Sequence, residues 1–202
     1  PKDNMQPKPP SNPGRRKFLI AATSIVGAGA VIGAAIPFLA AFNPSERAKA
    51  AGAPAKVDIS KLGKGEMMIV EWRGIPIYII RHTEQSLLIL NRNLSRLSDP
   101  HSEENQQPDY AKNPNRSIRE DVVVLEAVCT HLSCAPKFYP ESGTTNFDSD
   151  WQGGFFCPCH GSKFDLIGRV YSGVPAPTNL SIPPHYYESE HVIVIGEDGE
   201  IT

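Results

Sequence analysis

Hydrophobic and polar positions divide this chain of 202 residues into three parts. Residues 18–42 carry no ionisable side chain, and a helix of that length, rising about 1.5 Å per residue, crosses a hydrocarbon core of about 30 Å with some tilt. Residues 43–57 have no large apolar side chain before Val57, so they predict a flexible linker without a core. From residue 58 onward, short apolar runs alternate with polar turns.

The pattern of the third part predicts a head that is mainly β. Met67–Trp72 and residues 75–80 are β-forming runs on either side of Arg73-Gly74, which is typical of an antiparallel hairpin. Residues 83–97 carry leucines at helical spacing behind a Thr83 cap and predict a helix. Residues 98–118 are polar and predict a long loop. Further strands are expected over 121–128, 153–156, 163–165, 169–171 and 191–195.

Charge changes this picture at the N-terminal end. Residues 1–17 contain five basic residues and one acidic residue, whereas residues 43–202 contain 15 basic and 21 acidic residues. The basic end predicts that residues 1–17 form a cytoplasmic tail and that the head lies on the other side of the membrane. Arg15-Arg16 before the apolar stretch is similar to a twin-arginine signal. An acidic head without a basic stripe disfavours nucleic-acid binding.

The apolar stretch is read as a single transmembrane anchor over residues 18–42. It is longer than the core of a typical cleaved signal, which favours retention. Small residues at Ala40, Ala48, Ala50 and Ala51 keep cleavage open as an alternative. The predicted organisation is therefore a tail (1–17), an anchor (18–42), a hinge or linker (43–57) and a head (58–202).

All four cysteines lie in two similar motifs, which read as one site. The motifs are Cys129-Thr-His131-Leu-Ser-Cys134 and Cys157-Pro-Cys159-His160-Gly-Ser162. Two cysteines and two histidines also make an ordinary zinc site, although zinc modules usually pair Cys with Cys and His with His. Two structural disulfides are a second alternative. One thiolate and one imidazole from each loop favour a two-iron cluster with one iron on cysteines and the other on histidines.

On these motifs the sequence resembles the Rieske iron–sulfur proteins of respiratory and photosynthetic chains, whose loops read Cys-Thr-His-Leu-Gly-Cys and Cys-Pro-Cys-His-Gly-Ser. The resemblance implies one [2Fe–2S] cluster in a subdomain of about residues 127–178, inserted in an antiparallel β head. It implies these roles: Cys129 and Cys157 bind one iron, His131 and His160 bind the other, Cys134 and Cys159 form a disulfide, and the Ser162 hydroxyl donates to a cluster sulfide.

The same resemblance implies a proline loop and exposes two departures from the family pattern. Gly173-Val-Pro-Ala-Pro177 is expected to cover the cluster from a third side, with Leu132 at the docking tip. Ser133 replaces a usual glycine, which carries strain only if φ is positive there. Phe164 stands where many members have tyrosine, so a hydrogen bond to a ligand sulfur is missing and the reduction potential is expected to be lower.

For function, the resemblance implies the iron–sulfur subunit of ubiquinol–cytochrome c reductase, a cytochrome bc-type complex of a bacterial inner membrane with the head in the periplasm. The subunit would take one electron from ubiquinol at cytochrome b and pass it to cytochrome c1, as part of a dimeric oxidoreductase. His131 and His160 are both candidates for contacting quinol and accepting its proton. The alternatives are a plastoquinol–plastocyanin reductase, an arsenite-oxidase-type complex, or a zinc-stabilised membrane-anchored binding module.

Overall fold

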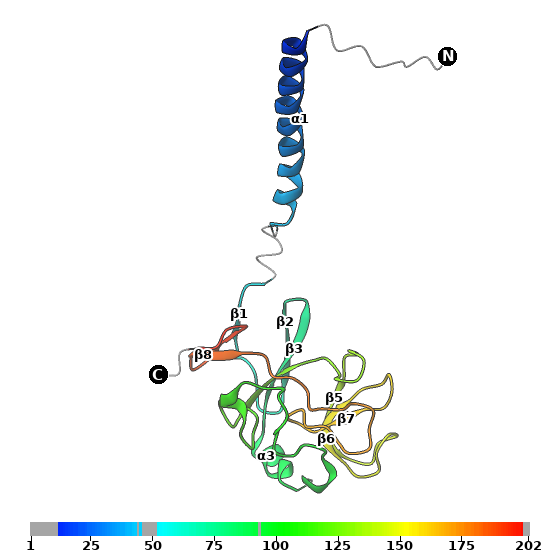
Figure 1. The fold of residues 1–202 in the computed structure, drawn as a ribbon. Coiled ribbons are helices and arrows are strands. Elements are labelled where there is room, and N and C mark those ends of the chain that lie inside the picture. The colour runs from blue at the N-terminus through cyan, green and yellow to red at the C-terminus, as the bar shows by residue number, and fades with distance from the viewer. Residues whose placement is uncertain (1–11, 44, 46–51, 93, 200–202) are drawn as a thin grey trace, which may run out of the picture. The chain divides into compact units, whose positions relative to one another are not determined.

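A computed structural model of the chain describes residues 12–43, 45, 52–92 and 94–199, and these residues fall into two compact units, Pro1–Lys49 and Ala50–Thr202 (Figure 1). Most of the expected tail, residues 1–11, lies outside the described residues. Residues 44 and 46–51 of the expected linker lie outside them as well. The two units are therefore considered separately.

The first unit contains one long helix, α1 (Pro13–Ala41). The Asn12 side chain caps it by accepting a hydrogen bond from the Arg15 N–H at 3.1 Å, and Pro13 supplies the fixed φ that suits a first helical turn. The helix therefore begins before the expected residue 18 and includes both arginines. With a mean hydropathy of 2.1 in its most apolar window, α1 is long and apolar enough to cross a membrane.

The described residues of the second unit form three antiparallel sheets of three strands each, and most of these strands are labelled in Figure 1. The first sheet has the order β1 (Ala55–Asp58), β9 (Val192–Ile195), β8 (His185–Ser189). The second has the order β2 (Met67–Trp72), β3 (Ile75–Arg81), β4 (Val122–Glu126). The third has the order β5 (Lys137–Gly143), β6 (Trp151–Phe156), β7 (Lys163–Phe164). The expectation of a mainly β head is confirmed.

Strands β3 and β4 of the middle sheet are buried on both faces, which explains why they are almost continuously apolar, whereas β2 is largely half-buried or exposed. Side chains of a strand alternate between faces. Ile77 and Ile79 of β3 accordingly pack in one core with residues of β1 and β9. Tyr78 and Ile80 point the other way, into a core shared with Phe155 and with two of the cysteines. The middle sheet thus connects the first sheet to the region that carries the cysteine loops.

Several sequence-based boundaries are wrong, each for an identifiable reason. Residues 55–57 were expected to be linker but form most of β1, because strand pairing uses backbone groups and needs only Val57 to be apolar. The expected helix over 83–97 is capped by Thr83 as predicted but ends at Asn91, a weak helix former. The structure then forms a short 3-10 turn, η1 (Leu94–Arg96).

Three further elements differ from expectation. β5 was not predicted, because its side chains are nearly all exposed and show no alternation. β8 was also not predicted. The expected strand over 169–171 consists only of isolated bridges, in which Val170 pairs with Phe164 and Tyr171 with Leu97. The expected loop over 98–118 contains one 3-10 turn, η2 (Asp109–Ala111).

Candidate metal centre

The first cysteine loop follows β4 and is closed by two backbone hydrogen bonds. The Cys129 N–H donates to the Cys134 carbonyl at 2.8 Å, and the Ser133 N–H donates to the Cys129 carbonyl at 2.9 Å. Ser133 has a positive φ of 61°. The sequence-based condition for strain at this position is therefore met. Leu132, the expected docking tip, is 64% exposed.

The second cysteine loop joins β6 to β7 and repeats the same closure. The Cys157 N–H donates to the Ser162 carbonyl at 2.8 Å, and the Gly161 N–H donates to the Cys157 carbonyl at 3.0 Å. Gly161 has a φ of 81°. The two loops therefore share one backbone design, in which the first cysteine is held by the residue five positions later.

A disulfide between Cys134 and Cys159 joins the two loops. Cys129 and Cys157 are free thiols, each with 1% of its surface exposed, and they belong to the same hydrophobic core. The sulfurs of Cys134, Cys157 and Cys159 lie within 4.8 Å of one another. Because two of these three form the disulfide, the thiols that remain for a metal are Cys157 and Cys129.

Burial raises the pKa of the Cys157 thiol, although the Cys159 N–H counteracts the rise, and the neighbouring Cys129 thiol raises the pKa further. A raised pKa keeps the Cys157 thiol protonated more readily, and a protonated thiol is a poor nucleophile. A metal that binds the two thiols has to displace their protons, and binding is then coupled to proton release.

The two motif histidines face each other at the end of the loops. The ring centroids of His131 and His160 are 4.7 Å apart, with ring planes at 89°. The Nδ1 atom of His131 is buried and has no hydrogen-bond partner among the described residues. Buried polar atoms are rarely left without a partner, and an imidazole nitrogen is a common metal ligand. This unsatisfied nitrogen, together with two buried thiols, fits a group bound by two cysteines and two histidines.

The expected proline loop, residues 173–177, is held against both cysteine loops. The Ala176 N–H donates to Ser162 Oγ at 3.0 Å, and Ser162 is fully buried. The Thr130 hydroxyl donates to the Thr178 carbonyl at 2.7 Å. Thr130 was not singled out from the sequence, although its place between Cys129 and His131 was a signal that its hydroxyl lies beside the site.

Phe164, the second departure from the family pattern, lies on β7, directly after the second cysteine loop. Its side chain is fully buried, pairs across the sheet with Phe155, and shares a core with Cys129 and Cys157. A hydroxyl added to this ring would therefore enter the core that holds the free thiols.

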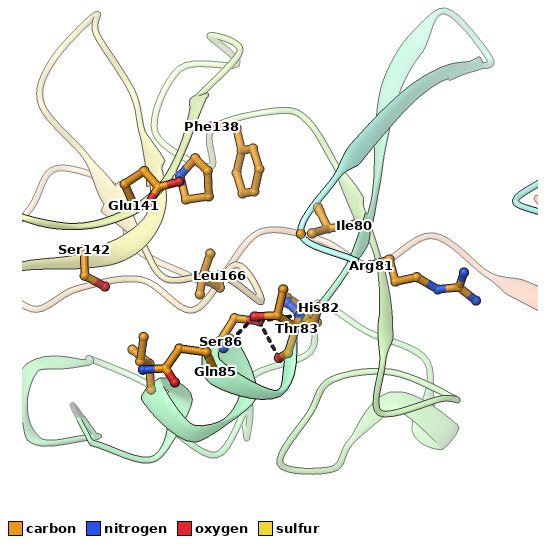
Figure 2. A pocket seen from close by; sticks show the side chains of 13 residues that line it. Ile80, Arg81, His82, Thr83, Gln85, Ser86, Phe138, Glu141, Ser142 and Leu166 are labelled. Carbon is orange, nitrogen blue, oxygen red and sulfur yellow. Dashed lines mark hydrogen bonds between the residues drawn. The ribbon is translucent and has the colours of Figure 1, made fainter. Parts of the chain in front are cut away.

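A separate cavity of about 430 Å³ lies between the end of β3, the start of α3 (Glu84–Leu90) and β5. Figure 2 shows Phe138 and Leu166 on one side of it and Thr83 and Ser86 on the other. The hydroxyls of Thr83 and Ser86 are already used in the cap of α3. None of the residues expected in the metal site lines this cavity.

Comparison with protein families gives two matches. Residues 103–184 match the Rieske [2Fe-2S] domain. Residues 5–45 match the "Ubiquitinol-cytochrome C reductase Fe-S subunit TAT signal" family. The first match covers both cysteine loops and the proline loop, and the second covers all of α1.

Comparison with individual proteins agrees with the two family matches. The chain is 52% identical over 187 residues to the ubiquinol-cytochrome c reductase iron-sulfur subunit of Allochromatium vinosum, covering 93% of this chain and 90% of the relative. It is 41% identical over 184 residues to the subunit of that name from Blastochloris viridis, covering 90% and 92%. Among solved structures, a chain of a "Hyperthermophilic respiratory Complex III" aligns with 25% identity and a TM-score of 0.47, covering 87% of this chain and 99% of that chain.

Proposed function

Because the chain belongs to the family of ubiquinol–cytochrome c reductase iron–sulfur subunits, we propose that its head carries single electrons from ubiquinol to cytochrome c1 within the assembled complex. The Rieske domain that the chain matches is a [2Fe–2S] domain, so the cofactor is one [2Fe–2S] cluster. The zinc-stabilised module, the plastoquinol–plastocyanin reductase and the arsenite-oxidase-type complex are disfavoured, because the similarity extends over 93% of the chain.

In this proposal Cys129 and Cys157 hold one iron, and His131 and His160 hold the other. When bound, the cluster supplies a carrier that takes up and gives back one electron. Neutral imidazoles in place of two thiolates make the site less negative, which favours uptake of the electron. Ser162 lies at the base of the second loop, where its hydroxyl can donate to a cluster sulfide.

The histidine rings also provide the contact with quinol. His160 is exposed and His131 is half-buried. An imidazole that binds iron through one nitrogen keeps the other for a hydrogen bond. We propose that this second nitrogen, in the form that has lost its own proton, would accept the hydroxyl proton of quinol while one electron passes from quinol to the cluster. Leu132 beside His131 provides an exposed apolar surface against which cytochrome b or c1 docks.

The observation that carries this assignment is the unsatisfied Nδ1 of His131 beside the two free, buried thiols. It is tested with the full chain in its membrane by electron paramagnetic resonance of the reduced state. We expect Cys129→Ser and Cys157→Ser to abolish the cluster signal, because serine cannot supply a soft thiolate. Cys134→Ser removes a cross-link and not a ligand, so part of the signal should survive. An unchanged signal in Cys129→Ser would refute the ligand assignment.

The surroundings of the head form the second part of the proposal. α1 serves as the single membrane anchor, with residues 1–17 in the cytoplasm and the head, which begins with β1 at Ala55, in the periplasm of a bacterial inner membrane. The partners are cytochrome b, cytochrome c1 and ubiquinol, in a dimeric complex. Purification of the membrane complex through this chain should bring down b-type and c-type haem, and their absence would contradict the assignment of partners.

A further inference from the structure

The proline loop is held at its tip by the cysteine loops and at its root by a distant segment. The tip contacts, from Ala176 to Ser162 and from Thr130 to Thr178, are the hydrogen bonds described above. The root consists of residues 165–170, which lead into the loop, and residues 179–180, which leave it. What holds the root decides how firmly the tip remains in place.

Within the root itself, one backbone hydrogen bond and one hydrogen bond to a side chain join the two parts. The Leu180 N–H donates to the Gly168 carbonyl at 2.8 Å. The Val170 N–H donates to the side-chain oxygen of Asn179 at 2.8 Å. Neither residue pair forms part of a strand, so the root lacks the support that a sheet would give.

Arg116 supplies that support from the middle of the long loop over 98–118. Its Nη1 donates to the Ile167 carbonyl at 2.7 Å, and its Nη2 donates to the Leu180 carbonyl at 2.7 Å. One guanidinium therefore bridges the two parts of the root. Nη2 also donates to Gln107 Oε1 at 3.3 Å, and the side chain is only 1% exposed.

The chemistry of arginine is needed for this contact. Burial lowers the pKa of Arg116 to about 10, so the group remains protonated at neutral pH and keeps its donors. Its acceptors among the described residues are all uncharged oxygens. The nearest acid in the root, Asp165, is paired instead with Arg169 at 2.6 Å. Arg116 thus acts through the fixed geometry of its planar fork, which a lysine ammonium does not reproduce.

Given the cluster site of the proposed function, on which this step rests, we propose that Arg116 is a positioning residue that holds the proline loop against Ser162 and Thr130. With the root bridged, the Ala176 N–H stays on Ser162 Oγ. That bond occupies one lone pair of the oxygen and leaves the hydroxyl proton free to point at a cluster sulfide. A loosened loop would let this hydroxyl rotate and would weaken a donor that stabilises the reduced cluster.

The test compares Arg116→Lys and Arg116→Met with the wild-type full chain in detergent-solubilised membranes. Hydrogen–deuterium exchange reads the amides of residues 173–180, and titration monitored by electron paramagnetic resonance reads the midpoint potential of the cluster. Arg119→Lys is the matched control, because Arg119 also donates to a carbonyl, that of Glu190, which lies between β8 and β9 and outside the loop and its root. Exchange does not require the cluster, so it separates failure of this proposal from failure of the cluster assignment.

We expect both Arg116 variants to speed exchange over residues 173–180 at least tenfold, with β3 unaffected. We also expect both to lower the equilibrium constant for accepting one electron several-fold, where a tenfold loss equals about 59 mV. Exchange at the wild-type rate would overturn the proposal. A wild-type potential in Arg116→Lys combined with a lowered potential in Arg116→Met would also overturn it, because charge and not positioning would then be responsible. The same changes in Arg119→Lys would show a general loss of stability.

Discussion

Ser133 and Gly161 occupy the same position in the two cysteine loops, and both have left-handed backbone conformations, with φ of 61° and 81°. Each donates its N–H to the carbonyl of the first cysteine of its loop. A residue with a Cβ pays about 1–2 kcal/mol for this conformation, whereas glycine does not. The first loop therefore stores strain that the second does not.

We predict that Ser133→Gly stabilises the head by about 0.5–1 kcal/mol, because relief of strain is partly offset by the greater freedom of glycine in the unfolded chain. The thermal unfolding midpoint should rise accordingly. The reciprocal variant Gly161→Ser should lower it by a similar amount, since no atom lies within 4 Å of a Cβ built there and backbone strain is the remaining effect. A lower midpoint for Ser133→Gly would contradict this explanation.

A second prediction concerns Phe164, which is buried beside the free thiols. Phe164→Tyr should raise the midpoint potential by about 20–60 mV, because a hydrogen bond to sulfur with a net value of about 0.5–1.5 kcal/mol favours the more negative reduced cluster. Voltammetry of the purified full chain measures the shift. Phe147→Tyr adds the same hydroxyl in a different hydrophobic cluster and should leave the potential unchanged. A potential lowered by Phe164→Tyr would show that the hydroxyl does not reach sulfur.

A third prediction follows from His82 at the cavity of Figure 2. Burial lowers the pKa of His82 to about 4 from an ordinary 6.5, against the opposing effects of Asp165 and Asp121. Between pH 6.5 and pH 4, the His82 side chain therefore binds a proton in the unfolded chain but stays neutral in the folded chain. Stability falls as pH drops through this window, by about 2 kcal/mol at pH 5.

His82→Phe should remove this part of the pH dependence. The Nε2 atom of His82 has no hydrogen-bond partner among the described residues, so this nitrogen loses no bond on substitution. Urea unfolding at pH 7.5 and pH 5 gives the two stabilities for each protein. His101→Gln, at an exposed position, is the control and should retain the wild-type slope. An equal slope in His82→Phe would assign the effect to other groups.

A fourth prediction concerns the start of the head. β1 pairs with β9 from Ala55 to Asp58, and Val57 is buried in the adjoining core. A fragment that starts at Gly52 should fold, whereas one that starts at Ile59 should be less stable by at least the value of burying one valine, about 1.5–3 kcal/mol. Circular dichroism during heating distinguishes the two. Equal midpoints would mean that β1 contributes nothing to the head.

The sequence predicted those parts of the fold in which side-chain chemistry follows a simple period. The long apolar stretch became α1, and the runs around Arg73-Gly74 became the β2–β3 hairpin. β1 and β5 were not predicted because both carry few buried side chains. In addition, β1 pairs with β9, which lies far along the chain. The helix α3 ends early at Asn91, a weak helix former, and Leu97, which was expected on that helix, pairs with Tyr171 instead.

For the site, the motifs were sufficient to identify which side chains come together, because each loop carries its own thiol and imidazole. They did not reveal the shared backbone closure of the two loops, which depends on φ at Ser133 and Gly161. Nor did they identify Arg116, a basic residue in a polar loop. Its burial depends on tertiary contacts with Ile167 and Leu180 that no local pattern records.

The sulfurs of Cys134, Cys157 and Cys159 lie within 4.8 Å of one another, so a free thiol lies close to a disulfide beside the candidate metal site. A thiolate at Cys157 lies within reach of the Cys134–Cys159 bond, and attack on it would exchange one disulfide for another by the ordinary thiol–disulfide route. In the proposed site, iron bound to Cys157 would block this exchange by occupying the attacking sulfur. If iron were lost, Cys157 could form a disulfide with Cys134 or Cys159 in place of the Cys134–Cys159 bond. Restoring the site would then require a reductant as well as new iron and sulfide.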